Sequence, residues 1–519
     1  MSTTARPREC AQPTARQCRW GSMKSVLFVT SLLALLPIAG CGADSGGSAP
    51  ATHTDPAADA GSNPPDGGAE GQAPTECGSA GASDAPDPEG KDENCDGADG
   101  VVGVDVYVDP SAGSDTNPGN PAAPLRSLKA AISLAGSRGG RVLLGKGQID
   151  IDVLEAADSY EIHGGYSPTF VGQRKRESSV LAPTKPLGLA LSGANEVTLV
   201  SLSIIGRNAD DKVTTAHALR TSVSHLKLVD VEVRAGNAAP GVVLGAPATG
   251  GDPGANATGS AGTQLSCKGA AQPSYSFGAA VGKVNALGAL PGNCTTKTPA
   301  TSGAPGQVGT HGAHATKEPV LEDGLVRWTA GSAAPDDAGP GLGGAGGANC
   351  VILGNYGGGA GSGGCPGGAG AGATSGGGSV AVLVLAGKLT LAGSLLRTGF
   401  GGNGGNGAPG GEGGIGGRGA RPGCGVGVDC NKIPVECTPA TDPYKLNCAG
   451  WGGAGGPGGK GGHGGAGAGG WTIGVVTVGA ASAKHDADTS FELGAPGNGG
   501  DGATTRAPDG EQHETWALP

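Results

Sequence analysis

The sequence predicts an all-β chain built as a parallel solenoid with long glycine-rich, disulfide-stapled insertions. Three observations lead to this prediction. Apolar residues recur at offsets of 0, 2, 5 and 7, with one polar exception, in three segments that can be laid over one another without gaps. Glycine accounts for 107 of 519 residues while aromatic residues make up 3%, so one large close-packed core cannot extend along the chain. Ten cysteines beyond residue 41 form an even set, which indicates disulfides in an exported chain.

The chain begins with the features of an export signal. Lys24 precedes an apolar run over residues 26–38 that is too short to span a bilayer. The run ends in Ile-Ala-Gly-Cys at residues 38–41, which resembles the lipobox of bacterial lipoproteins. The resemblance implies that residues 1–40 are a leader and lipoprotein signal peptide, and that Cys41 carries the lipid. It places the protein in the bacterial cell envelope, at the outer membrane or cell surface, with the membrane as a partner; an ordinary signal peptide with a chance cysteine is the alternative.

Charge and composition limit the partners of the exported chain. The formal net charge is -11, and five basic residues and one acid lie in the first 40, so the remainder carries about -15. Nucleic acid is therefore not expected as a partner. Residues 41–76 are rich in Ala, Gly, Pro, Ser and Asp and cannot bury enough apolar surface to offset their ordering entropy. This segment is predicted to be a flexible tether.

The mature cysteines are expected to pair with one another. Neighbours along the chain would give five bridges, and no CxxC pair supports zinc as the competing explanation. The disulfide candidates are Cys77, Cys95, Cys267, Cys294, Cys350, Cys365, Cys424, Cys430, Cys437 and Cys448.

Residues 77–100 form an acidic, cysteine-stapled loop that suggests structural calcium. Asp92, Asn94 and Asp96 at alternate positions, followed by Gly97, resemble the first half of an EF-hand loop, where oxygen ligands converge and glycine makes the turn. Position twelve of that loop is Gly103, so the bidentate glutamate is missing. Another acid would have to take its place, from Asp84, Asp87, Glu89 or Asp99. The tentative calcium ligands are Asp92, Asn94, Asp96 and Asp99; a solvated acidic turn closed by Cys77 and Cys95 is the alternative, and no other cofactor is expected.

Residues 101–240 are predicted to hold an N-terminal cap and the first coils. An alternating strand from Val104 is followed by Gly-Ser-Asp-Thr-Asn-Pro-Gly at 113–119 and Pro-Leu-Arg-Ser-Leu-Lys-Ala-Ala-Ile at 124–132. This succession resembles the opening of right-handed parallel β-helix proteins of the pectate-lyase-like superfamily, in which it caps the first coil. The resemblance implies a right-handed parallel β-helix, whose open end needs a cap because unpaired strand edges invite aggregation.

The repeated offsets define the expected coils. Each offset of two is strand alternation, and the step of three marks a kink between two short strands. The matching residues are Val197, Leu199, Leu202 and Ile204; then Leu226, Leu228, Val231 and Val233; then Leu389, Leu391, Ser394 and Leu396. The third set lies in a coil predicted over residues 380–400, so residues 241–379 are read as a glycine-rich disulfide insert.

Residues 401–470 form a second insert, built on a GGX repeat of period three. Polyglycine II has three residues per turn and would place every third residue on one ridge. The tracts resemble the glycine-rich repeats of PE-PGRS surface proteins. An ordered polyglycine II array and a disordered linker are both left open. Residues 471–519 are expected to form C-terminal strands and a tail.

Catalytic residues are not expected anywhere in the chain. Asp230, Glu232 and Arg234 would share one strand face, but overlay of the coils shows no second row of acids beside them. The sequence therefore predicts an envelope-anchored, extracytoplasmic structural or adhesive binding protein without catalytic activity. A surface polysaccharide or a protein would be its ligand. The alternative function is a polysaccharide lyase or hydrolase of the pectate-lyase-like superfamily.

Overall fold

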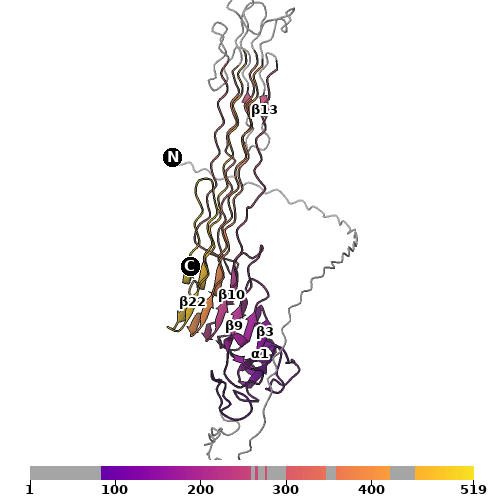
Figure 1. The fold of residues 1–519 in the computed structure, drawn as a ribbon, viewed down its shortest axis with the longest axis vertical. Helices are drawn as coiled ribbons and strands as arrows, with labels where there is room; N and C mark the ends of the chain where they lie inside the picture. The colour runs from indigo at the N-terminus through magenta and orange to yellow at the C-terminus, as the bar shows by residue number, and fades with distance from the viewer. Residues whose placement is uncertain (1–82, 259–263, 267–274, 278–299, 346–357, 421–450) are drawn as a thin grey trace, which may run out of the picture. The chain divides into compact units, whose positions relative to one another are not determined.

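The computed structural model describes residues 83–258, 264–266, 275–277, 300–345, 358–420 and 451–519. All described residues belong to one compact unit, which lies within Gln72–Pro519. They form three parallel β-sheets, two antiparallel hairpins, one α-helix, one 3-10 turn and extended glycine-rich segments (Figure 1). Within this described part, no helix has the length and apolar character needed to cross a membrane.

The first sheet contains seven strands in the order β1-β2-β5-β8-β11-β18-β21, each parallel to its neighbours. The strands are β1 (Val106–Val108), β2 (Val142–Gly145), β5 (Tyr160–Tyr166), β8 (Glu196–Val200), β11 (His225–Val229), β18 (Lys388–Ala392) and β21 (Ser482–His485). Side chains alternate between the two faces of a strand. In β11, Leu226 and Leu228 are buried while Lys227 between them is exposed, so one face of the sheet belongs to the core.

The second and third sheets contain six strands each, in the orders β23-β20-β17-β10-β7-β4 and β22-β19-β12-β9-β6-β3. The second comprises β4 (Val153–Glu155), β7 (Leu189–Ser192), β10 (Ala216–Thr221), β17 (Ser379–Val384), β20 (Thr472–Val478) and β23 (Gln512–Leu518). The third comprises β3 (Gly147–Asp150), β6 (Ser179–Ala182), β9 (Ser203–Ile205), β12 (Glu232–Arg234), β19 (Leu395–Arg397) and β22 (Ser490–Glu492). The hairpins are β13 (Gln264–Ser266) with β14 (Tyr275–Phe277), and β15 (Val320–Glu322) with β16 (Leu325–Arg327).

From β3 onward, and apart from the hairpins, the chain enters the third, second and first sheets in a repeating order. Leu226 pairs with Val197 on one side and Leu389 on the other. Val233 is paired in the same way, in the third sheet. The residues with matching sequence offsets therefore lie beside one another in space.

The predicted right-handed parallel β-helix is nevertheless wrong. The strands form three open parallel sheets, each ending in two edge strands, and no closed or solenoid sheet is found among the described residues. The apolar offsets specify which residues of neighbouring strands pair, because pairing depends on side-chain alternation. They carry no information on how separate sheets are joined or on the hand of the connection, which came from the family resemblance alone.

A left-handed backbone residue explains the step of three in the offsets. Ser201, Asp230 and Gly393 have φ angles of 50°, 51° and 55° and occupy the same place between a strand of the first sheet and one of the third. A positive φ is uncommon for residues other than glycine and turns the chain sharply. Each of these residues makes the corner at which the chain leaves one sheet for the next.

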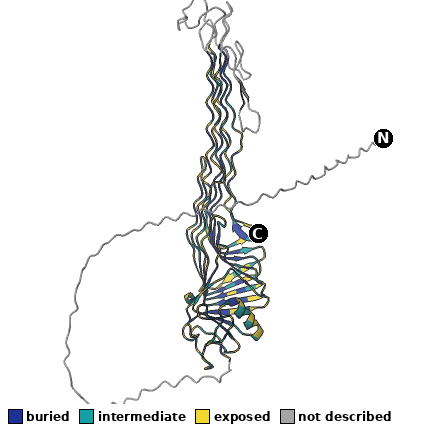
Figure 2. Ribbon diagram, turned by 90° about the vertical axis from the view of Figure 1, so that its right-hand side faces the viewer, coloured by how far each residue is buried: buried dark blue, intermediate teal, exposed yellow. Residues whose placement is uncertain are grey.

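Inward-facing aliphatic side chains from all three sheets form one core cluster (Figure 2). Helix α1 (Leu128–Arg138) packs Leu128, Ala131 and Ala135 against this core close to β1 and β2. Ser127 caps its first turn by accepting a hydrogen bond from the amide of Ala130. Gly139, with φ 70°, ends it in the left-handed conformation. The helix thus follows the capping rules and covers the first strands of the fold.

The glycine-rich segments leave the third sheet and return to the second as a bundle of extended chains that runs away from the sheets (Figure 1). Residues 399–420 follow β19, and residues 358–378 and 452–470 lead into β17 and β20. Their backbone amides donate at every third residue: Gly402, Gly405, Ala408, Gly411, Gly414 and Gly417 donate to the carbonyls of Gly377, Thr374, Ala371, Gly368, Cys365 and Ser362. This period is that of a helix with three residues per turn. The described parts of both GGX tracts are therefore ordered.

The register of the sheets continues into the bundle. Ser379 in β17 pairs with Thr472 in β20, and upstream Gly376 and Ala373 donate to the carbonyls of Ala468 and Gly465. Neighbouring tracts that enter the same sheet are thus parallel, as their strands are. Tracts that leave the third sheet run antiparallel to those that enter the second. The glycine-rich segments are long connections between two sheets rather than separate units.

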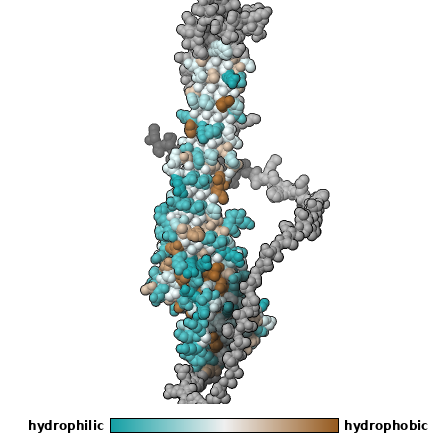
Figure 3. Space-filling model, in the orientation of Figure 1, coloured by the Kyte–Doolittle hydropathy of each residue, from teal (hydrophilic) through white to brown (hydrophobic). Residues whose placement is uncertain are grey.

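Glycine is required where the tracts face one another. A Cβ atom added to Gly413 would lie 1.9 Å from the carbonyl oxygen of Gly458. The residues at every third position of the tract are instead exposed, namely Asn403, Asn406, Pro409, Glu412, Ile415 and Arg418. On the face shown in Figure 3, the bundle is pale with scattered apolar side chains, while hydrophilic side chains dominate over the sheets. Backbone contacts therefore hold this tract in the bundle, and the side chains of this row point out of it.

We predict that Gly413→Ala destabilises the bundle by about 1–3 kcal/mol, because the new methyl group must displace backbone atoms. Ile415→Ala is the matched control in the same tract, since Ile415 is 73% exposed, and should change stability by no more than about 0.5 kcal/mol. Urea unfolding followed by circular dichroism measures both. Equal stability of the two variants would show that the tracts are not closely packed.

We also predict that Leu228→Asp destabilises the sheets by about 3–5 kcal/mol, because an unpaired carboxylate would be buried among aliphatic side chains. Leu228 is fully buried between its partners in β8 and β18. Lys227→Asp introduces the same group on the exposed face of the same strand and should be nearly neutral. Thermal unfolding of both variants is the measurement. If Leu228→Asp were nearly as stable as the wild type, the three sheets would not share one closely packed core.

Candidate functional site

Residues 83–105 cover the outer face of the first sheet near its first strands. Tyr107 of β1, Leu143 of β2 and Tyr166 of β5 are fully buried under this segment, together with Phe170. The rings of Tyr107 and Phe170 meet edge to face with centroids 5.0 Å apart. Tyr107 points away from the aliphatic core because it alternates with the inward residues Val106 and Val108. Tyr166 reaches the same outer face because the register between β2 and β5 shifts before it, where Gly165 has a φ of 85°. They create a second, smaller core that the acidic segment closes.

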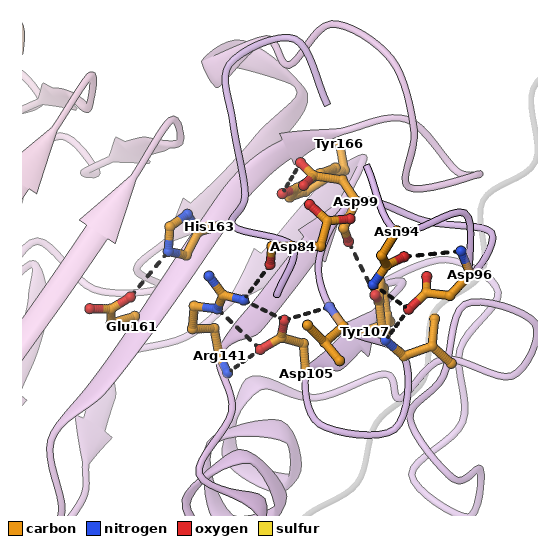
Figure 4. Close-up of polar contacts among 12 residues, drawn as sticks. Asp84, Asn94, Asp96, Asp99, Asp105, Tyr107, Arg141, Glu161, His163 and Tyr166 are labelled. Atoms are coloured by element: carbon orange, nitrogen blue, oxygen red, sulfur yellow. Dashed lines mark hydrogen bonds and ion pairs between the residues drawn. The ribbon is translucent and has the colours of Figure 1, made fainter. Parts of the chain in front are cut away.

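An acidic cap cluster surrounds these aromatic rings (Figure 4). We define it as Asp84, Asp96, Asp99 and Asp105 with Arg141 and Arg174. Asp105 is the member whose charge is fully paired: Arg141 Nη2 lies 2.8 Å from its Oδ2, and Arg141 Nε lies 3.1 Å from its Oδ1. The amides of Val101 and Arg141 donate to the same carboxylate at 2.9 and 2.7 Å. Asp105 is therefore a structural residue that joins the cap to β2.

Asp99 is fully buried but only half satisfied. Its Oδ2 accepts a hydrogen bond of 2.8 Å from the Tyr166 hydroxyl, and its Oδ1 has no hydrogen-bond partner. Burial raises the pKa of Asp99 to about 7. The Tyr166 hydrogen bond and the charge of Arg174 oppose this rise, and the negative charge of Asp84 adds to it. The Asp99 carboxylate is thus held in a dry place with too few donors.

Asp84 is likewise a buried acid whose carboxylate oxygens lack hydrogen-bond donors. It is 1% exposed, and neither of its carboxylate oxygens has a hydrogen-bond partner. Burial raises its pKa to about 6, and nearby Glu93, Asp92 and Asp96 add repulsion. The backbone amide of Glu93 lowers this pKa but does not reach hydrogen-bonding geometry. A buried carboxylate without partners is costly when it is ionised, so Asp84 marks a point where positive charge would be favourable.

Some oxygens of the predicted calcium ligands accept backbone hydrogen bonds within the turn, whereas others are buried without a partner. Both carboxylate oxygens of Asp92 accept backbone hydrogen bonds, from Asp96 at 3.0 Å and Gly97 at 2.8 Å. The Asn94 oxygen accepts from the Asp96 amide at 3.0 Å, and its Nδ2 donates to Asp96 Oδ2 at 3.0 Å. These groups shape the turn. Asp96 Oδ1 and Asp99 Oδ1, by contrast, are buried without a partner.

The four predicted ligands are thus divided between the turn and the buried acidic cap cluster. Over the described ranges, no group of three or more His, Cys, Asp or Glu side chains is arranged to hold a metal ion. Asp84 was considered from sequence only as one of several substitutes for the missing glutamate. No sequence signal singled it out, because its burial depends on residues far along the chain, such as Arg141, whose Nη2 donates to its carbonyl at 2.9 Å.

The acidic strand face considered for catalysis is also arranged differently from the prediction. Asp230 is not on a strand face with Glu232 but at the left-handed corner before β12. Its carboxylate accepts from Ser201 Oγ at 2.9 Å and lies 3.2 Å from Arg176 Nη1. Glu232 is 3.1 Å from Arg397 Nη1. The two acids point to different arginines, because the corner rotates the chain between them.

The cysteines are mostly outside the described residues. Cys95 and Cys365 are disulfide-bonded. The predicted lipidation site Cys41 and the candidates Cys77, Cys267, Cys294, Cys350, Cys424, Cys430, Cys437 and Cys448 lie outside the described residues. The pairing scheme remains a prediction.

Comparison of the chain with protein-family models, with curated proteins and with solved structures finds no match.

We predict that, with divalent cations chelated, the protein becomes less stable as the pH rises from about 4 to about 7. Asp84 and Asp99 have raised pKa values in the folded state, so the fold favours their protonated forms, and this stability is lost as the pH passes the folded pKa. Urea midpoints at pH 5 and pH 8 measure the effect. Asp99→Asn should reduce the difference between the two midpoints, whereas Asp211→Asn, at an exposed position, should not. An unchanged pH dependence in Asp99→Asn would contradict the assignment.

Proposed function

We propose that this protein is an envelope-anchored, extracytoplasmic structural or adhesive protein without catalytic activity. The ordered glycine-rich bundle is the observation that carries the proposal. Its tracts are joined by backbone hydrogen bonds every third residue, and most of their mutual contacts are between glycine backbones and carbonyl groups. Such a bundle needs no large apolar core, so it can extend far for its mass. This property suits a protein that presents a binding surface at a distance from its membrane anchor.

The outward side chains of the bundle support an adhesive role. The exposed positions of residues 403–418 recur every third residue and include amide, acidic, basic and apolar groups. Lys460 and Glu412, on adjacent tracts, are joined by an ion pair 2.6 Å long. A regular row of this kind offers repeated contacts to a polymer such as a surface polysaccharide. Many weak contacts on one rigid body give a combined affinity greater than each contact alone.

The arrangement of acids gives no support to the alternative function, polysaccharide cleavage. A glycosidase needs two carboxyl groups on either side of one bond. Glu232 is paired across the third sheet with Ser203 and Leu395, so no acid lies beside it on a neighbouring strand. The charge of Glu232 is shared instead with Arg397, which also contacts Glu492 at 2.8 Å.

The anchoring part of the proposal rests on the sequence, because Cys41 lies outside the described residues. A lipid at Cys41 and a flexible segment over 41–76 would hold the folded unit at a membrane surface. A single acyl chain gives only marginal membrane binding, so stable anchoring at Cys41 would need a second signal.

We predict that Cys41→Ala moves the protein from the membrane fraction to the soluble fraction, because it removes the lipidation site. The measurement is detergent partitioning followed by immunoblotting of both variants. Cys365→Ala, which changes a cysteine within the bundle, is the control and should stay with the membrane. Retention of Cys41→Ala in the membrane would remove the anchor from the proposal.

The released Cys41→Ala protein also tests the absence of catalysis. Incubated with uronic-acid and neutral polysaccharides, it should produce no new reducing ends and no unsaturated products. A cleaving activity that is lost in Glu232→Gln, with unfolding unchanged, would overturn the proposal in favour of the enzyme.

A further inference from the structure

We propose that Asp84 and Asp99 bind a calcium ion in the acidic cap cluster. The ion would not occupy the turn formed by Asp92, Asn94 and Asp96. The site goes beyond the proposed function, because anchoring and adhesion do not require it.

The first argument is that these two carboxylates are buried and incompletely satisfied. Asp84 is 1% exposed and Asp99 is not exposed, and three of their four carboxylate oxygens have no hydrogen-bond partner. The loss of hydration is offset in proteins by hydrogen bonds, by a paired cation or by a metal ion. Here hydrogen bonds supply one oxygen only, from Tyr166.

The second argument is that neither nearby arginine forms an ion pair with these two carboxylates. Arg141 binds the Asp105 carboxylate and the main-chain carbonyl of Asp84, not the Asp84 side chain. Arg174 donates to the carbonyls of Gly164 and Asp87 and lies over the Tyr166 ring, 4.9 Å from its centroid. Its Nη2 is buried without a hydrogen-bond partner, and its charge acts on Asp99 only from beyond ion-pair distance. No ion pair joins either arginine to the carboxylate of Asp84 or Asp99 within the described part of the chain. A cation from outside the chain would therefore supply the close positive charge that these two carboxylates lack.

The third argument concerns the kind of cation. Asp84 is the strongest repelling neighbour of Asp99, and both residues lie in the group drawn in Figure 4. The donors available are oxygens, which hard cations prefer, and Cys95 is disulfide-bonded rather than a free thiolate. Because no three acidic side chains converge here, the protein would supply two carboxylates, with carbonyl oxygens and water completing the shell. Calcium tolerates such irregular shells, whereas magnesium requires a near-ideal octahedron.

A bound ion would fasten the cap to the sheets. Asp99 is already fixed by its backbone, since its amide donates to Phe170 at 3.0 Å and its carbonyl accepts from Tyr107 at 3.1 Å. Asp84 lies fifteen residues earlier in the chain, beside Arg141. An ion shared by the two acids would join the start of the acidic segment to the part that packs on β1 and β5.

The test compares calcium binding by the full chain and by four variants, using thermal unfolding in EDTA and in millimolar CaCl2. We expect calcium to raise the wild-type Tm by several degrees, and Asp84→Asn and Asp99→Asn to lose this rise. In EDTA, Asp84→Asn should be at least as stable as the wild type, because a buried unpaired charge is gone. A purely structural role for Asp84 would give the opposite sign.

Two further variants locate the ion. Asp211→Asn is exposed and should keep the full calcium response. Asp92→Asn should also keep it; loss of the response in Asp92→Asn with retention in Asp84→Asn would place the ion in the turn and overturn the assignment.

Terbium luminescence provides a measurement that does not depend on variant stability. Tb3+ added to the wild type should show emission sensitised by Tyr107 and Tyr166, and calcium should displace it. Absence of both this emission and a calcium-dependent Tm would overturn the site, whereas the membrane and polysaccharide experiments would be unaffected.

Discussion

The fold depends on close approach between backbones whose contacts are formed mainly by glycine and other small residues. In the bundle, amides and carbonyls of neighbouring tracts bond at every third residue, and carbonyl oxygens occupy the space where a Cβ atom would otherwise lie. Two glycines per triplet make this possible, and the third residue is free to face solvent. A bundle built in this way draws its cohesion from hydrogen bonds and backbone contacts rather than from apolar burial.

The sheets supply what the bundle lacks, which is a defined register. Aliphatic side chains from all three sheets pack into one core, and their alternation fixes which residues pair. This pairing continues into the glycine tracts, where Gly376 follows the register of Ser379. A glycine repeat alone could slide by three residues at little cost. Anchoring each tract in a sheet strand at one end removes that freedom.

The outer face of β1 and β2 is aromatic and aliphatic, so another part of the chain has to cover it. The segment before β1 covers Tyr107 and Leu143 and brings a dense set of acids with it. One of these acids, Asp105, is neutralised by Arg141. Asp84 and Asp99 are buried by the same packing without an equivalent partner. The cap therefore combines a well-packed core with unbalanced charge, which is the condition under which a cation contributes most to stability.

The sequence alone determined the local periods of this protein. The offsets of Leu226, Leu228, Val231 and Val233 anticipated the strand register, and the step of three in them is the corner at Asp230. The GGX repeat fixed the three-residue period of the tracts. Periodicity is readable because it reflects side-chain direction, which the backbone sets locally.

Only the tertiary structure decided the rest. Neither the three open sheets nor the continuation of their register into the bundle follows from local period. Both depend on contacts between residues far apart in the chain, such as Ser379 and Thr472. For the acids of the cap as well, the sequence indicated one part and only the tertiary structure showed the other. Sequence spacing identified Asp92, Asn94 and Asp96 as a turn, but it could not show that their oxygens bind backbone amides. It also could not show that Asp84 and Asp99 are buried, because desolvation is set by the distant strands that pack over them.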